Sequence, residues 1–259
     1  MYYILFLISI FIFIYCKYKL KDEAEKFTLN NELYLSMTTI PERLIHPWFL
    51  NNIKYLLSLG SYFKIIINIP YYFKRNNEIY IIPNELVKLA DKTNRIILNR
   101  VKEDYGPITK LYGPLLNNSI PDEADILILD DDIHYKPEFI NIIFNKYKND
   151  TNKIYSFCDN TIQGYHSFLV KKKILKPILK FKNPNNCFRI DDNFIQLSVK
   201  KLNIPIEMVS YKGKTGNFCS INKDIHDNHT PKWDELKWDD RTPIVEKCYK
   251  DFIKLNCYY

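Results

Sequence analysis

Three consecutive carboxylates, Asp130, Asp131 and Asp132, follow a mostly apolar run at 124–129. Like charges this close repel one another, and at the end of a buried strand they are costly unless they are solvated or neutralised. Mg²⁺ and Mn²⁺ neutralise such groups well because these cations prefer carboxylate oxygens. The run therefore predicts a divalent metal site, able to hold a phosphate, at the mouth of an α/β sheet, where ligands of such sheets bind. The alternative is a solvated acidic loop that caps a helix after Pro137.

The elements that must position these carboxylates follow from alternating strand-like and helix-like segments. In the first part of the chain they are strands at 33–39, 63–69, 95–101 and 124–130, and helices at 47–59, 83–90, 107–116 and 137–148. Crossovers of this length join parallel strands, so we expect a doubly wound, mainly parallel α/β sheet. The rest is less regular, with strands at 153–158, 166–170 and 206–211 and helices at 192–202 and 244–255.

The composition is that of a globular domain with a moderate basic excess. The chain has 259 residues, of which 46% are hydrophobic and 26% are charged, and this is enough for one sizeable core. The net charge is +7, and the lysines are scattered apart from short clusters at 17–21 and 171–173. This pattern suits anionic small molecules or a membrane surface, and it lacks the basic stripe of a nucleic-acid-binding protein. We therefore expect no nucleic-acid partner.

The cysteines and glycines provide no familiar binding motif. None of the six cysteines pairs at zinc-ligand spacing, which argues against a zinc ribbon. One or two disulfides would form in an oxidising compartment and none in a reducing one, and the spacing does not decide between them. Neither a P-loop nor a GxGxxG loop occurs, so metal and basic side chains would have to hold a diphosphate.

The N-terminus carries a membrane signal, because residues 2–16 are uncharged and Lys17, Lys19 and Lys21 follow at once. A spanning helix needs about 20 residues, and residues 1–20 suffice if the lysines extend to the interface. No small-residue cleavage site follows, which favours an anchor over a removed signal peptide. We predict a single-pass anchor at 1–20 and a short stem at 21–31. Its orientation stays open: the lysines favour a cytoplasmic domain, whereas ER/Golgi-type enzymes with one anchor face the lumen.

In the order and spacing of its motifs, the chain resembles the GT-A glycosyltransferases, which use nucleotide-diphospho-sugars as donors. The segment 36–43 is similar to their first strand and nucleotide-binding turn, and Asp130-Asp131-Asp132 is similar to their DXD motif. The segment 104–111 is similar to the Asp-x-Gly-Pro-x-Thr-Lys segment of one branch. This segment followed by a DXD motif is far more specific than a lone DXD.

The resemblance extends over roughly residues 32–230 and implies a GT-A domain at 32–259. Ile190-Asp191-Asp192 is similar to the acidic triplet that carries the catalytic base, and Gly164 to the short glycine loop before the acceptor site. The chain departs from the family at Asp191, where Glu is frequent. Its match to a C-terminal metal-binding histidine is loose.

For the metal, the resemblance implies Mn²⁺ or Mg²⁺ bound by Asp130 and Asp132, acting as a Lewis acid on the departing nucleoside diphosphate. Alternate side chains of an extended segment point the same way, so these two would share one face. Asp131 would point elsewhere, towards the ribose. His226 or His229 would complete the metal site, although either could instead be a surface or core histidine.

For the base, an inverting transfer needs a carboxylate that takes a proton from the acceptor hydroxyl. Asp192 is the candidate and Asp191 is the second choice. The alternative role for this pair is an N-cap of the helix that follows, for which Asp is well suited.

For the nucleotide, five residues at the ends of strands or helices are candidates. Lys110 lies near the start of its helix, where an ammonium group would attract phosphate, and its alternative is a solvated lysine. Arg43 would contact the nucleotide and Asp104 the base or ribose. Thr38 and Thr39 would line the pocket of the base.

These features predict a membrane-anchored, metal-dependent, inverting glycosyltransferase with a nucleotide-sugar donor and a glycan, protein or lipid acceptor. One alternative is a nucleotidyltransferase on a similar sheet, although such enzymes often carry a Gly-rich basic loop where this chain has Thr-Thr-Ile-Pro-Glu-Arg. The other is a non-catalytic, membrane-tethered sugar-binding protein, which would be expected to have lost a key carboxylate. The sequence does not select the sugar, the base or the acceptor.

Overall fold

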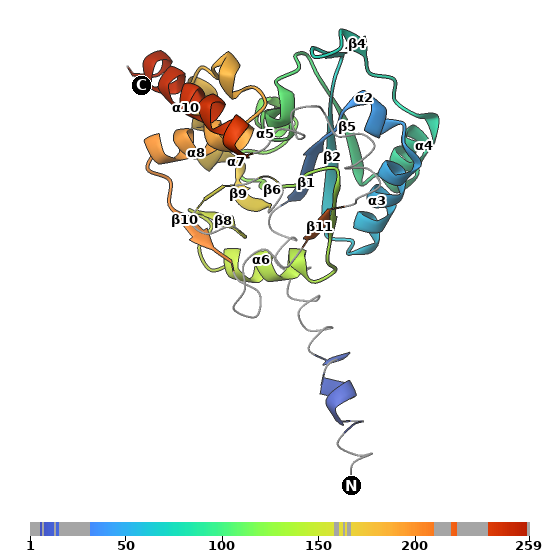
Figure 1. Cartoon of the computed structure of the whole chain (residues 1–259). Helices are drawn as coiled ribbons and strands as arrows, with labels where there is room; N and C mark the ends of the chain where they lie inside the picture. The colour runs from blue at the N-terminus through green and yellow to red at the C-terminus, as the bar shows by residue number, and fades with distance from the viewer. Residues whose placement is uncertain are drawn as a thin grey trace.

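The centre of the computed structural model is a mainly parallel sheet. The structure describes residues 6, 8–12, 14–15, 32–157, 161–162, 164, 167–209, 219–221 and 238–257. Within these residues the central sheet has seven strands in the order β10-β8-β9-β6-β1-β2-β5 (Figure 1). They are β1 Leu33–Thr38, β2 Phe63–Pro70, β5 Ile96–Val101, β6 Asp125–Ile128, β8 Ile154–Ser156, β9 Phe168–Lys171 and β10 Ile206–Met208. Within this central sheet, the described pairings are parallel except those of β9, which runs antiparallel to β6 and β8.

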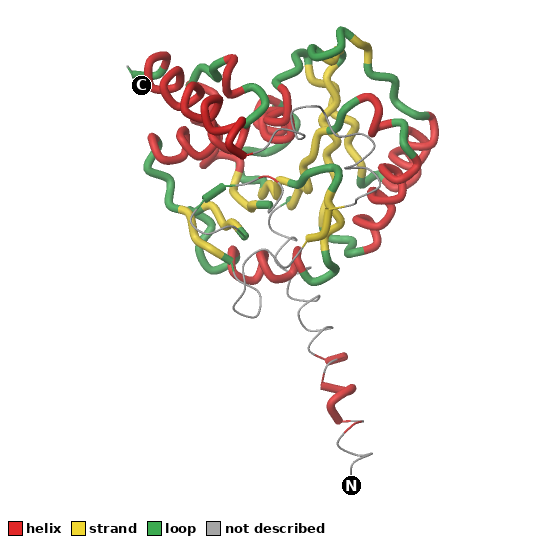
Figure 2. The backbone as a smooth tube through the Cα atoms, in the orientation of Figure 1, coloured by secondary structure: helices red, strands yellow, loops and turns green. Residues whose placement is uncertain are grey.

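Helices cover both faces of this sheet, which lies between them in Figure 2. One face is covered by α2 Pro41–Leu44, α3 Pro47–Ser58, α4 Asn84–Thr93 and α6 Phe139–Tyr147. The other is covered by α5 Thr109–Leu116, α7 Lys172–Leu175, α8 Asp191–Lys201 and α10 Trp238–Leu255, with the 3₁₀ turns η1 Gly106–Ile108, η3 Lys176–Lys180 and η4 Asn185–Cys187. This architecture confirms the predicted α/β class and its mainly parallel sheet.

Two hydrophobic cores hold the layers together. Side chains of β1 alternate between them, with Leu35 and Met37 in one core and Tyr34 in the other. From α3, Phe49 and Ile53 pack on the first of these cores. A strand buried on both faces reads as a continuous apolar run, which is why the central strands could be found in the sequence.

Two small antiparallel pairs were not predicted. One joins β3 Tyr72–Phe73 to β4 Glu78–Ile79, and the other joins β7 Ile133–Tyr135 to β11 Cys219–Ile221. The strand predicted at 124–130 ends at Ile128, and β7 starts at Ile133, directly after the acidic triplet. The helix predicted at 244–255 begins earlier, at Trp238, and contains Pro243.

The predicted anchor at 1–20 lies mostly outside the described residues, and the stem at 21–31 lies outside them entirely. Residues 6, 8–12 and 14–15 are helical, and Phe6 and Phe11 are 61% and 72% exposed. In the part of the chain that is described, no helix is both long enough and apolar enough to cross a membrane. The anchor therefore stays a prediction.

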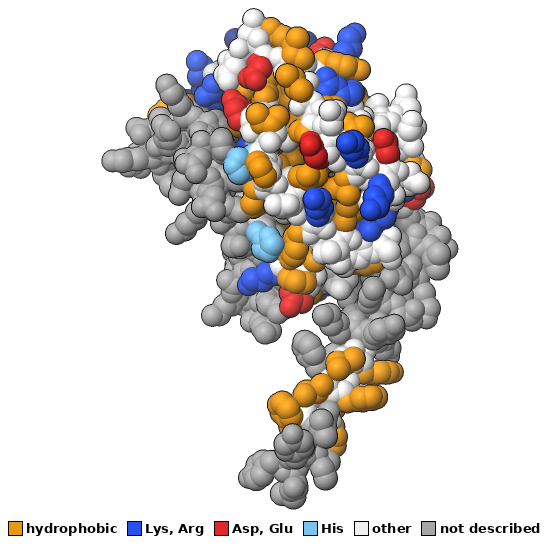
Figure 3. Space-filling view, turned by 90° about the vertical axis from the view of Figure 1, so that its right-hand side faces the viewer, with side chains coloured by type: hydrophobic (Ala, Val, Ile, Leu, Met, Phe, Trp, Pro, Cys, Tyr) orange, Lys and Arg blue, Asp and Glu red, His pale blue; other side chains and the backbone are white. Residues whose placement is uncertain are grey.

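The view in Figure 3 shows one face of the domain with its charged side chains. Among the residues described there, Lys and Arg side chains alternate with Asp, Glu, apolar and neutral polar ones. They do not merge into one continuous basic stripe on this face. This distribution agrees with the scattered lysines of the sequence.

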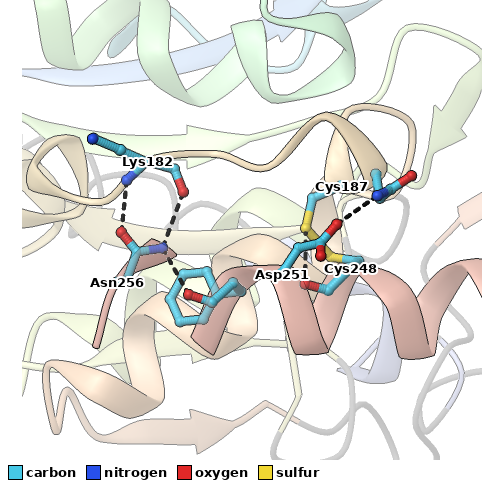
Figure 4. The surroundings of a disulfide bond; sticks show 7 residues. Lys182, Cys187, Cys248, Asp251 and Asn256 are labelled. Atoms are coloured by element: carbon cyan, nitrogen blue, oxygen red, sulfur yellow. Dashed lines mark hydrogen bonds between the residues drawn. A yellow bond between two sulfur atoms is a disulfide. The ribbon is translucent and has the colours of Figure 1, made fainter. Parts of the chain in front are cut away.

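A disulfide between Cys187 and Cys248 joins η4 to the C-terminal helix α10 (Figure 4). Nearby, the side-chain oxygen of Asn256 accepts a hydrogen bond from the Lys182 amide at 2.8 Å, and its amide group donates to the Lys182 carbonyl at 3.0 Å. The sequence left the redox state of the cysteines open. The structure pairs these two, and Cys257 is an exposed free thiol.

We expect Cys248→Ser to lower the free energy of unfolding markedly. The disulfide spans a sequence separation of 61 residues. For a loop of that size, the lost constraint on the unfolded chain corresponds to about 4 kcal/mol. Urea unfolding under non-reducing conditions measures the loss, with Cys257→Ser as the matched control that should leave stability unchanged. Equal stabilities of Cys248→Ser and the wild type would show that this bond does not form.

Candidate active site

An open pocket of about 660 Å³ lies where β1 and β6 end. These strands are parallel neighbours, with Ser36 beside Ile128, so the residues that follow both strands meet at one edge of the sheet. The pocket is lined by all the predicted site residues except the two histidines: Thr38, Thr39, Arg43, Asp104, Lys110, Asp130, Asp131, Asp132, Asp191 and Asp192. His226 and His229 lie outside the described residues.

The acidic triplet is divided between two basic residues. Asp130 Oδ1 lies 2.7 Å from Lys110 Nζ. Asp131 Oδ1 lies 2.8 Å from Arg43 Nη1, and Asp132 Oδ2 lies 3.2 Å from Arg43 Nη2. The prediction that the triplet continues an extended segment is wrong, because the chain turns at 131–132.

The triplet is also not a solvated acidic loop. The side chains of Asp130, Asp131 and Asp132 are only 25%, 8% and 16% exposed. Asp131 does not point freely into the pocket, because its Oδ2 accepts a hydrogen bond from the Thr39 hydroxyl at 2.6 Å. The turn is fixed from the other side by Tyr135, whose hydroxyl oxygen accepts a hydrogen bond from the Asp130 amide at 2.9 Å.

Carboxylates outnumber cations around this turn, and the pKa values reflect it. Burial alone would lower the pKa of Arg43, but the charges of Asp131 and Asp132 raise it above its ordinary value. Burial, and then the charge of Asp131, raise the pKa of Asp132 to about 6, although Arg43 opposes this. Asp132 is therefore a carboxylate that a further positive charge would stabilise.

Lys110 is not the solvated lysine that the sequence left as an alternative. Its side chain is 4% exposed, and Nζ lies 2.9 Å from Asp191 Oδ2 in addition to its contact with Asp130. Burial alone would lower the pKa of Lys110, but these two carboxylates raise it well above its ordinary value. Its ammonium group, predicted to attract phosphate, is thus directed at carboxylates.

The turn before α5 depends on Gly106. Its φ is +73°, and a Cβ at this position would lie 2.5 Å from the carbonyl oxygen of Phe188. Only glycine fits both the left-handed backbone and this close approach. The turn thereby packs against the segment that leads to the acidic pair.

The acidic pair opens α8. Ile190 is the N-cap and there is no side-chain cap, so the alternative that Asp191 or Asp192 is an N-cap is wrong. The Asp191 carboxylate forms an ion pair with Lys110, whereas Asp192 Oδ1 accepts a hydrogen bond from the Gly164 amide at 2.7 Å. Burial, and then the charge of Asp191, raise the pKa of Asp192 to about 8.

Three of the residues predicted to bind the nucleotide make hydrogen bonds within the protein. Asp104 is 4% exposed, and its two oxygens accept hydrogen bonds from the amides of Gly106 at 2.7 Å and Lys74 at 2.9 Å. The Thr38 hydroxyl donates a hydrogen bond to the Asn68 carbonyl at 2.8 Å, and the Thr39 hydroxyl donates one to the Asp131 carboxylate. These residues shape the pocket wall.

Several lining residues were missed by the sequence reasoning. The hairpin region contributes Phe73, Arg75 and Tyr80, and the Tyr80 hydroxyl donates to the Thr39 carbonyl at 2.8 Å. On the other side, Arg189 precedes the acidic pair and Arg241 comes from α10, the helix that the disulfide holds. No sequence signal marks these arginines, because the fold alone brings them to the pocket.

The donor chemistry of the triplet fits a hard divalent cation. Among the described residues, no group of three or more His, Cys, Asp and Glu side chains is arranged to hold one ion. Asp130 and Asp132 nevertheless supply carboxylate oxygens at the pocket wall. Such oxygens are the ligands that Mn²⁺ and Mg²⁺ prefer.

Comparison with known proteins identifies no family. No family model matches the chain, and no curated protein does either. The inference of function therefore depends on the motifs of the sequence and on the geometry of the pocket.

Proposed function

We propose that the protein is a metal-dependent GT-A glycosyltransferase that moves a sugar from a nucleotide-diphosphate donor to an acceptor hydroxyl with inversion. The observation that carries this proposal is that two acidic groups line one pocket: the triplet after β6 and the pair Asp191-Asp192 at the start of α8. Glycosyl transfer requires both a group that stabilises the departing diphosphate and a base for the acceptor.

On the donor side, Asp130 and Asp132 would hold the cation. When bound, the cation would act as a Lewis acid on the diphosphate as it departs. Arg43 keeps Asp131 and Asp132 in place through its two contacts. Arg75, Arg189 and Arg241 also line the pocket, and a guanidinium group is a side chain that binds phosphate oxygens well.

On the acceptor side, Asp192 is the better candidate base. The Asp191 carboxylate is paired with the Lys110 ammonium group at 2.9 Å, whereas Asp192 Oδ1 accepts a hydrogen bond from the Gly164 amide at 2.7 Å. As a carboxylate, Asp192 would take the proton of the acceptor hydroxyl while that oxygen attacks the anomeric carbon. The Gly164 amide orients the carboxylate for this step.

We also propose that the domain is anchored to a membrane by residues 1–20. The uncharged run at 2–16 followed by three lysines supports this. The described side chains of Phe6 and Phe11 are exposed rather than packed in the core. The orientation of the domain stays open.

Nucleoside diphosphate release tests the proposal. The full chain, incubated with Mn²⁺ and a panel of UDP-, GDP- and other nucleotide sugars, is expected to hydrolyse one donor slowly and to stop when EDTA is added. Proton NMR of the transfer product should show an inverted anomeric configuration. Release of pyrophosphate from a nucleoside triphosphate and a sugar phosphate would favour a nucleotidyltransferase. Donor binding without turnover for any acceptor would favour a sugar-binding protein.

A further inference from the structure

The Lys110 ammonium group lies between the two acidic groups of the pocket. Its Nζ is 2.7 Å from Asp130 Oδ1 and 2.9 Å from Asp191 Oδ2. The backbone is fixed as well, because the Ser36 hydroxyl of β1 donates to the Lys110 carbonyl at 2.6 Å. A buried ammonium group needs paired charges, and these two carboxylates supply them.

Gly164 provides the space for this ammonium group. A Cβ at Gly164 would lie 2.3 Å from Lys110 Nζ and 3.2 Å from Asp130 Oδ1. Among the described glycines only Gly106 has a positive φ, so Gly164 is required for space rather than for backbone conformation. Its amide also donates to Asp192 Oδ1 at 2.7 Å. One residue thus contacts groups from both acidic sets.

We propose that Lys110 is a positioning residue, and that Gly164 makes room for it. The ammonium group sets the separation between the donor-side carboxylate Asp130 and the acidic pair at Asp191. It is also a resident positive charge that competes with a divalent cation for Asp130. The catalytic part of this inference rests on the proposed function, whereas the competition follows from the geometry.

This arrangement predicts opposite effects of removing Lys110 on cation binding and on turnover. Without the ammonium group, Asp130 loses its resident counter-charge, so a cation should bind more tightly. Turnover should nevertheless fall, because Asp130 and Asp191 are no longer held at a fixed separation. Removing a lysine that only stabilises the fold would lower stability without tightening the binding of a cation.

The test compares Lys110→Met with the wild type, both as the full chain. Electron paramagnetic resonance of free Mn²⁺ should show a dissociation constant about tenfold lower in the variant. Donor hydrolysis at saturating Mn²⁺ should be about tenfold slower. Lys172→Met is the matched control, because Lys172 is 1% exposed, lies outside the pocket and donates to the carbonyls of Asn117 and Ile120 at 2.8 Å. It should lose stability and keep its affinity for Mn²⁺.

A double-mutant cycle tests the contact with Gly164. Gly164→Ala should slow hydrolysis about tenfold in the wild type and have little further effect in Lys110→Ala, where the ammonium group is gone. Gly60→Ala is the steric control, because its Cβ would lie 2.4 Å from the Tyr62 ring, outside the pocket. Additive effects of Gly164→Ala and Lys110→Ala would overturn this part of the proposal.

The outcomes separate this inference from the proposed function. Weaker Mn²⁺ binding by Lys110→Met, together with donor hydrolysis by the wild type, would overturn the proposed role of Lys110. The proposed glycosyltransferase activity would be unaffected by that result. Tighter Mn²⁺ binding with no hydrolysis of any donor would support the ammonium competition and contradict the transferase. A wild type that binds no Mn²⁺ would overturn both.

Discussion

Asp192→Asn is expected to lower the rate of transfer about 10³-fold, with the affinity for the nucleoside diphosphate near that of the wild type. Asparagine keeps the size of the side chain and can still accept the Gly164 amide, but it cannot take a proton. The loss should therefore appear in kcat and not in donor binding. Asp122→Asn is a suitable control, because Asp122 is half-exposed, pairs with Lys176 at the surface and lies outside the pocket. Activity near that of the wild type would assign the base elsewhere.

The same residue predicts a pH dependence. Burial, and then the charge of Asp191, raise the pKa of Asp192 from 3.8 to about 8. Only the carboxylate accepts a proton, so kcat/KM should rise with pH and level off above about pH 8. Removing the like charge in Asp191→Asn should move this rise to lower pH. A profile that is flat between pH 6 and pH 9 would contradict the assignment.

Stability gives a check that does not depend on activity. Because the pKa of Asp192 is raised in the folded state, the folded chain keeps a proton that the unfolded chain has lost between about pH 4 and pH 8. The free energy of unfolding should therefore contain a contribution that is present at low pH and is lost as the pH rises through about 8. Urea unfolding of Asp192→Asn should lack this decline. An equal decline in both proteins would place the titrating group elsewhere.

The sequence predicted the fold where the signals are local. The strand expected at 33–39 is β1 Leu33–Thr38, and the helix expected at 47–59 is α3 Pro47–Ser58. Each depends on a short apolar pattern and on Pro or Gly at its ends. The antiparallel direction of β9 could not be predicted, because pairing direction depends on neighbours that are distant in the chain.

The candidate site, too, was predicted only in part from the sequence. The sequence identified the residue types, and the pocket brings all of those within the described residues together. It did not identify the partners, because the contact between Arg43 and Asp131 joins residues that are 88 positions apart. For the same reason, the disulfide and the arginine that α10 contributes had no sequence signal.

Asp132→Asn is expected to reduce Mn²⁺-dependent turnover about 10³-fold while the protein stays folded. The substitution removes a carboxylate suited to the cation, and Arg43 keeps its contact with Asp131 at 2.8 Å. It also removes a negative charge that is buried beside another, since the pKa of Asp132 is raised to about 6. Stability near neutral pH should therefore be equal to that of the wild type or higher.

Asp131→Asn is the contrasting variant, because it should destabilise the fold rather than remove a ligand of the cation. Asp131 is 6% exposed and accepts hydrogen bonds from Arg43 and Thr39, so Asp131→Asn removes the charge of the shorter of the two carboxylate contacts of the buried guanidinium group. Weakening hydrogen bonds to a buried charged group costs about 1–3 kcal/mol of unfolding free energy. Urea unfolding, Mn²⁺ binding and donor hydrolysis measured on both variants should separate a binding defect at Asp132 from a folding defect at Asp131. If Asp132→Asn turns over donor like the wild type, or loses as much stability as Asp131→Asn, then Asp132 does not hold the cation.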